Sequence, residues 1–122
     1  MVRFLIVCGA GGAGCGARYL IALAVGPRSF PYATLIVNLI GSFLIALILE
    51  ASLRGAAMSP NLRAGIATGF LGGMTTYSSF NYETTALAAQ HAWWRVGLNV
   101  GVTLIGCALA GLAGLWLARR LT

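Results

Sequence analysis

Four long runs of apolar residues, joined by short polar links, dominate this sequence of 122 residues. Each run is close to or longer than the ~20 residues that a helix needs to cross the ~30 Å hydrocarbon layer of a membrane. Hydrophobic residues make up 59% of the chain and charged residues only 8%, too few polar groups to cover a soluble domain. We therefore expect one all-α integral-membrane domain over residues 1–122, with four transmembrane helices at about 4–25, 32–50, 62–90 and 97–118.

The charged residues lie mostly in the links and at the ends. All eight basic residues are arginines, the only acids are Glu50 and Glu83, and the net charge is +6. With four spans, both termini and the second link share one side of the membrane, which holds Arg3, Arg54, Arg63, Arg119 and Arg120. The other side holds Arg28 and Arg95, together with Arg18 if its side chain extends to the interface. This modest bias is compatible with a cytoplasmic N-terminus or with insertion in both orientations.

Several functional classes are not indicated. Cys8, Cys15 and Cys107 are scattered through apolar segments without a CxxC pair or a histidine cluster, so we expect no disulfide framework and no cysteine metal site. No nucleophile–base pair or nucleotide motif is visible, so we expect no enzyme. No basic stripe with interleaved aromatic residues points to a nucleic-acid partner.

Two patterns concern how the helices pack. Glycines at 12 and 16, and again at 97 and 101, have the spacing that lets membrane helices approach closely. The segment VNLIGSFL, residues 37–44, is echoed by VTLIGCAL, residues 102–109. The second and fourth spans are therefore expected to present similar faces.

The third run holds the segment GFLGGMTTYSSF, Gly69–Phe80. A straight helix of this run would be ~42 Å long, and either tilt or a break would fit it to the membrane. We place a break at Gly72-Gly73. Five hydroxyl-bearing residues, 75–79, follow it. A single such hydroxyl usually bonds the carbonyl four residues earlier, but five in succession favour a functional role.

The deep polar residues are mostly hydrogen-bond donors, which suits a path for anions better than one for cations. After the break, Tyr77, Phe80 and Glu83 are expected on one helical face together with Thr76 and Thr84. The rings of Tyr77 and Phe80 project together, and an aromatic edge is electropositive. Such edges are suited to holding a small anion. Serines 78 and 79 point to other faces, where a second helix would receive them.

Three further polar positions have more than one interpretation. Asn38 lies in the middle of the second span, where its amide would either donate to an anion or join two helices. Carbonyl groups near Gly72 and Thr75 lose their helical partners at the break and would face a monovalent cation or a water molecule. Arg18 would neutralise Glu83, meet carbonyls or extend to the interface.

The segments GFLGGMTTYSSF and VNLIGSF together resemble the Fluc/CrcB family of fluoride channels. The likeness covers essentially the whole chain: a glycine-rich run ending at Arg18-Tyr19, the motif Asn38–Phe43, and a fourth-span pattern over Asn99–Cys107. The most specific part is a GG-x-TT-aromatic-S-x-F pattern in the third span, followed three residues later by Glu83. The family is expected to have phenylalanine where this chain has Tyr77.

The resemblance implies an antiparallel, dual-topology homodimer of four-helix subunits in the bacterial inner membrane, with two fluoride pathways along the dimer interface. It implies a central structural sodium ion on the backbone carbonyls of Gly72 and Thr75. The fluoride pathway would include Asn38, Tyr77, Phe80, Ser79, Thr103 and Glu83, with Arg18 in an aqueous vestibule. Thr103 and Cys107 stand where asparagine or serine would be expected.

The function indicated is passive, selective export of fluoride from the cytoplasm. One alternative is a small four-helix multidrug–proton antiporter, for which Glu83 is the only deep carboxylate. Another is a non-transporting assembly subunit held together by its glycine-rich faces, which would need no broken helix lined with donors.

Overall fold

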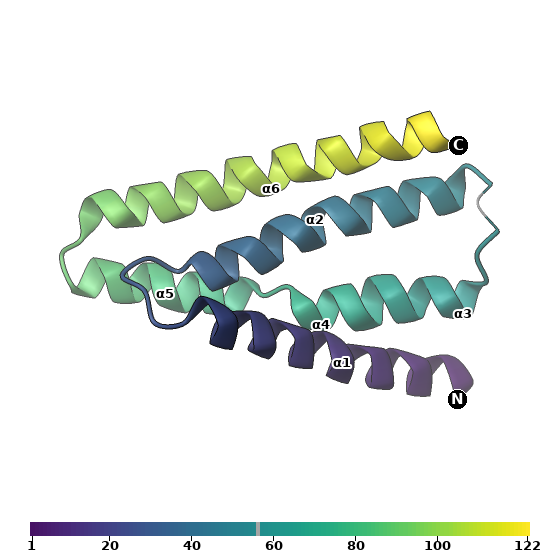
Figure 1. Cartoon of the computed structure of the whole chain (residues 1–122), viewed down its shortest axis with the longest axis horizontal. Coiled ribbons are helices and arrows are strands. Elements are labelled where there is room, and N and C mark those ends of the chain that lie inside the picture. Colours follow the sequence, from purple (N-terminus) through teal and green to yellow (C-terminus); the bar gives the residue numbers. More distant parts are fainter. Residues whose placement is uncertain (56) are drawn as a thin grey trace.

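The computed structural model describes residues 1–55 and 57–122, and these residues form helices without any strand (Figure 1). The third run consists of short pieces placed end to end, and the other three runs are single helices. The elements in chain order are α1 (Val2–Val25), α2 (Tyr32–Leu53), α3 (Pro60–Arg63), the π-helix η1 (Ala64–Leu71), α4 (Gly72–Met74), α5 (Tyr77–Ala89) and α6 (Trp93–Leu121). The all-α fold class is confirmed.

Three of these helices, α1, α2 and α6, are long and apolar enough to cross a membrane. The run from α3 to α5 extends from one end of the bundle to the other beside them (Figure 1). Local sequence signals set several helix ends. Gly26 ends α1 with φ 66°, a conformation that glycine adopts easily, and Pro27 follows. Ser59 caps α3 by accepting a hydrogen bond from the Leu62 N–H at 3.2 Å.

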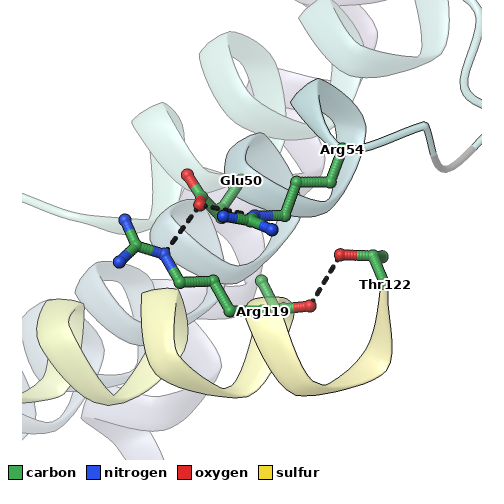
Figure 2. A network of polar contacts seen from close by, with 5 residues as sticks. Glu50, Arg54, Arg119 and Thr122 are labelled. Carbon is green, nitrogen blue, oxygen red and sulfur yellow. Dashed lines mark hydrogen bonds and ion pairs between the residues drawn. The ribbon is translucent and has the colours of Figure 1, made fainter.

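Both termini lie at the same end of the bundle as the link from α2 to α3, as expected for four antiparallel segments (Figure 1). Figure 2 shows the polar contacts at this end. The Glu50 carboxylate of α2 accepts hydrogen bonds from the Nε atoms of Arg54, at 2.8 Å, and of Arg119 in α6, at 2.9 Å. The Arg3 Nε donates to the Asn61 side chain at 3.1 Å. Ionic and polar contacts therefore tie the ends of neighbouring helices.

Helix α2 packs along α6, and α1 packs against η1 and α4. Glycine permits the closest approaches. A Cβ atom at Gly14 would overlap the backbone of η1, and one at Gly114 would overlap the backbone of α2. In contrast, no described atom of another helix lies within 4 Å of the Cβ positions of Gly12, Gly16, Gly97 or Gly101. The expectation that these spaced pairs pack helices together is therefore wrong within one chain.

The outward surface is rich in large apolar side chains, such as Phe4, Leu20, Leu53 and Leu112, which are all more than half exposed. The buried core is small and centres on Val37, Leu71 and Met74. Such a surface is stable when lipid tails cover it.

The break in the third run lies at Thr75 and Thr76, not at Gly72-Gly73. Gly72 has helical torsion angles, φ −63° and ψ −36°, whereas the two threonines are extended, with ψ 153° and 116°. Gly73 serves helix packing instead, because a Cβ there would overlap the Gly11 carbonyl of α1. Glycine permits many conformations but does not by itself end a helix.

Candidate functional site

The break is stabilised by a side chain from another helix. Asn38, in the middle of α2, forms two hydrogen bonds with the backbone of Thr76. Its Nδ2 donates to the Thr76 carbonyl at 3.1 Å, and its Oδ1 accepts from the Thr76 N–H at 2.8 Å. The Asn38 oxygen thus replaces the helical acceptor that the Thr76 N–H loses, and its amide nitrogen adds a donor to the Thr76 carbonyl, which is the N-cap carbonyl of α5. Of the two interpretations of Asn38, joining helices is confirmed, and one of its two amide hydrogens is not used in this pair.

The hydroxyl groups around the break bond mainly to each other and to nearby backbone. Thr75 Oγ1 donates to the Leu71 carbonyl at 2.9 Å, which is the ordinary bond four residues back. Thr76 caps α5 by accepting from the Ser79 N–H at 3.1 Å. Its hydroxyl also lies 3.1 Å from those of Ser78 and Ser79. Part of the hydroxyl run therefore stabilises the start of α5.

A hollow of about 330 Å³ opens beside the break. Its polar lining comes from α2, α6, the break and the start of α5, and consists of Asn38, Ser42, Thr75, Thr76, Tyr77, Thr103 and Cys107. The apolar lining comes from Gly41, Ile45, Leu71, Phe80 and Leu104. The echoed segments of α2 and α6 contribute equivalent positions to this wall. Two echoed pairs, Asn38 with Thr103 and Ser42 with Cys107, line the hollow, whereas Val37 is buried and its counterpart Val102 is exposed.

The aromatic pair lies in this hollow as expected. The ring centroids of Tyr77 and Phe80 are 5.7 Å apart, with the planes inclined at 52°. Phe80 is 7% exposed, whereas Tyr77 is 74% exposed. One ring is therefore fixed inside the bundle, and the other stands at the open side of the hollow.

Phe80 is held in place through α6. The Asn99 side chain, 2% exposed, donates from Nδ2 to Thr84 Oγ1 at 2.8 Å. The Thr84 hydroxyl donates to the Phe80 carbonyl at 2.7 Å. Asn99 lies four residues before Thr103 on the same face of α6, so this buried chain of hydrogen bonds fixes α5 against the wall of the hollow.

Ser79, Glu83 and Arg18 lie outside this hollow and line a second one of about 300 Å³, together with Thr34. Thr34 donates to Glu83 Oε1 at 2.6 Å, and the buried Oε2 atom has no hydrogen-bond partner among the described residues. Arg18 forms no ion pair with Glu83 in the described chain, and donates only to the Cys15 sulfur at 3.9 Å. Glu83 therefore faces a different hollow from Tyr77 and Phe80, and its place on one ion path with them stays a prediction.

Sequence reasoning missed Thr34 as a site residue, although a signal was present. Thr34, Asn38 and Ser42 follow each other at intervals of four residues along α2. Residues at this interval share one face of a helix. The polar stripe therefore runs along α2 from the second hollow to the first.

The backbone at the break presents carbonyl oxygens that could accept a cation. The carbonyls of Gly72 and Thr75 receive no hydrogen bond from the described residues. The residues that would normally donate to them, Thr76 and Ser79, donate instead to side-chain oxygens. Such oxygens suit a monovalent cation, so the residues present fit the sodium expected from the family resemblance. No group of three His, Cys, Asp or Glu side chains suited to metal occurs in the described part of the chain.

The chain is related to known proteins along almost its whole length. The family model described as CrcB-like protein, Camphor Resistance (CrcB), matches residues 5–115. The chain belongs to the CrcB family.

Several CrcB relatives carry the name fluoride-specific ion channel FluC. The protein from Geobacter sulfurreducens is 45% identical over 124 residues, which cover 99% of this chain and 100% of the relative. The protein from Anaeromyxobacter sp. is 47% identical over 125 residues, covering 99% and 98% respectively. The protein from Sorangium cellulosum is 44% identical over 124 residues, covering 99% and 98%.

The CrcB assignment settles the general class of the chain. With its long apolar helices, it is a multi-pass integral membrane protein. The relatives are named as channels and not as enzymes, which agrees with the expectation that the chain is not an enzyme. Their names favour neither the antiporter nor the assembly subunit. The roles of the individual site residues stay predictions.

Proposed function

We propose that this protein is a passive, fluoride-selective ion channel that exports fluoride from the cytoplasm across the bacterial inner membrane. The observation that carries the proposal is the hollow beside the break, which an amide, several hydroxyls and two aromatic rings line in an otherwise apolar bundle. The names of the CrcB relatives support the same ion.

Fluoride is small and strongly hydrated, so a path for it needs donors that replace water without binding the ion too tightly. Asn38 from α2 and Thr103 from α6 supply an amide N–H and a hydroxyl to the lining of the hollow. Tyr77 and Phe80 supply electropositive ring edges, and Tyr77 adds a phenol hydroxyl. Ser79, Glu83 and Arg18, in the second hollow, would extend this path towards an aqueous vestibule.

The functional unit is proposed to be an antiparallel homodimer with two pathways. The first hollow is open on one side, and the exposure of Tyr77 leaves an incomplete wall that a second copy would close. Gly72 is also exposed, and its carbonyl and that of Thr75 would hold a central sodium ion between the two copies. The positive charge of that ion would offset the partial negative charge of these carbonyl oxygens.

The test is ion efflux from liposomes that contain the purified protein. We expect fluoride to leave rapidly down its gradient, while chloride stays inside under the same conditions. Equal efflux of both ions, or efflux of neither, would show that the proposed function is wrong.

A further inference from the structure

Arginines at the two ends of the bundle have different hydrogen-bond partners. At the end that holds the termini, Glu50 accepts hydrogen bonds from both Arg54 and Arg119 (Figure 2). At the opposite end, the guanidinium groups of Arg28 and Arg95 form hydrogen bonds only with backbone carbonyls. Arg28 Nε donates to the Val25 carbonyl at 3.2 Å, and Arg95 Nη1 donates to the Ser29 carbonyl at 3.4 Å. Within the described residues, neither forms an ion pair.

These two arginines line a common hollow of about 340 Å³ between the link from α1 to α2 and the facing ends of α5 and α6. The amide of Gln90 and the phenol of Tyr82 also line it, and Glu83 is its only acid. Two guanidinium groups and one carboxylate give this hollow a net positive charge. Glu83 also lines the second hollow with Ser79 and Arg18, so the two spaces adjoin at the Glu83 side chain.

We propose that Arg28 and Arg95 form an anion-collecting mouth, which raises the local concentration of small monovalent anions and sets the rate at which they enter the bundle. This inference rests on the proposed fluoride channel. Arginines without a carboxylate partner at the edge of a low-dielectric bundle attract anions from solution. Arg54 and Arg119, at the other end, would attract anions less strongly, because Glu50 offsets their charge.

A purely structural role predicts different behaviour. Arg95 also lies over the Trp94 ring, 5.3 Å from its centroid, which is an ordinary arrangement for a residue at a membrane interface. If anchoring were its only role, the effect of losing it would not depend on salt. Attraction between an exposed charge and an anion weakens as salt rises, because the screening length falls from about 30 Å at 10 mM to about 8 Å at 150 mM.

The experiment measures initial fluoride efflux at low fluoride concentration from liposomes of uncharged lipids, for the full chain and for Arg28→Gln and Arg95→Gln. Each variant should lower the rate about two- to fivefold at ~10 mM ionic strength, as expected for one charge about 10 Å from the ion. The loss should shrink to less than about twofold near 300 mM. Arg95→Lys, which keeps the charge, should retain most of the rate.

Arg120→Gln is the matched control. Arg120 lies over the Trp116 ring at 5.3 Å, so this variant removes the same charge and the same type of stacking at the other end of the bundle. Because Arg120 lines none of the hollows described above, we expect this variant to leave the rate unchanged at both salt concentrations. The inference is overturned if Arg28→Gln and Arg95→Gln match Arg120→Gln, if their loss is independent of salt, or if Arg95→Lys is as slow as Arg95→Gln. Absence of fluoride efflux from the unchanged protein would instead refute the channel itself.

Discussion

Replacing Asn38 by aspartate tests the donor-lined hollow most directly. The new carboxylate would still accept from the Thr76 N–H, but it would lose the donor that now bonds the Thr76 carbonyl. It would also place a negative charge in the wall of a hollow of about 330 Å³. An anion inside would be roughly 5 Å away, and at an effective dielectric constant of about 20 the repulsion is about 3 kcal/mol. This corresponds to a loss of fluoride flux of roughly 100-fold.

The variant should also lose stability, because it loses the hydrogen bond from Asn38 to the Thr76 carbonyl, and one such bond contributes about 0.5–1.5 kcal/mol. Fluoride efflux from liposomes and the midpoint of thermal unfolding in detergent separate the two effects. Asn61→Asp is the matched control, since Asn61 lies outside the hollow and accepts from Arg3. That variant should behave like the unchanged protein. A folded Asn38→Asp variant with more than half of the original flux would remove Asn38 from the ion path.

Three further predictions concern other parts of the bundle. Tyr77→Phe keeps the ring of the exposed aromatic residue, so fluoride efflux should stay within about threefold, whereas Tyr77→Ala should lower it by more than about tenfold. Gly14→Ala should lower the unfolding free energy by about 1–3 kcal/mol, because its Cβ would overlap the backbone of η1. Gly12→Ala, whose Cβ would meet open space, should leave the unfolding free energy unchanged, and thermal unfolding of both variants measures the difference. Asn99→Leu breaks one buried hydrogen bond and Thr84→Val breaks two, so each should lower the unfolding free energy by about 1–3 kcal/mol. The double variant should lose less than the sum, and additive losses would contradict the coupling.

The helices were largely predictable from hydropathy and from the residues in the links. The expected spans end within four residues of the observed ones. The largest difference occurs where α6 begins at Trp93, and α2 and α6 each end three residues later than expected. Amphipathic tryptophan and arginine residues continue α6 beyond its apolar part. The π-helix η1 was not foreseen, and nothing in its apolar sequence distinguishes it from an α-helix.

The site was predictable only in part, because tertiary contacts decided the rest. Each residue turns an α-helix by about 100°, so Glu83 lies about 120° around α5 from Tyr77, and Ser79 about 160°. This angular separation places both in a hollow other than the one that holds Tyr77 and Phe80. The position of the break depends on Asn38, which is far away in sequence, so glycine composition alone indicated the wrong residues.

The pair between Asn38 and Thr76 has a consequence for how the chain is assembled in the membrane. Without α2 beside it, an isolated third segment would leave the Thr76 N–H unsatisfied in lipid, and continuing the helix would be more stable. The extended residues are therefore expected to form only after the second and third segments have met. Biogenesis would then proceed from straight rods to the kinked native form, with lateral docking as the step that creates the kink.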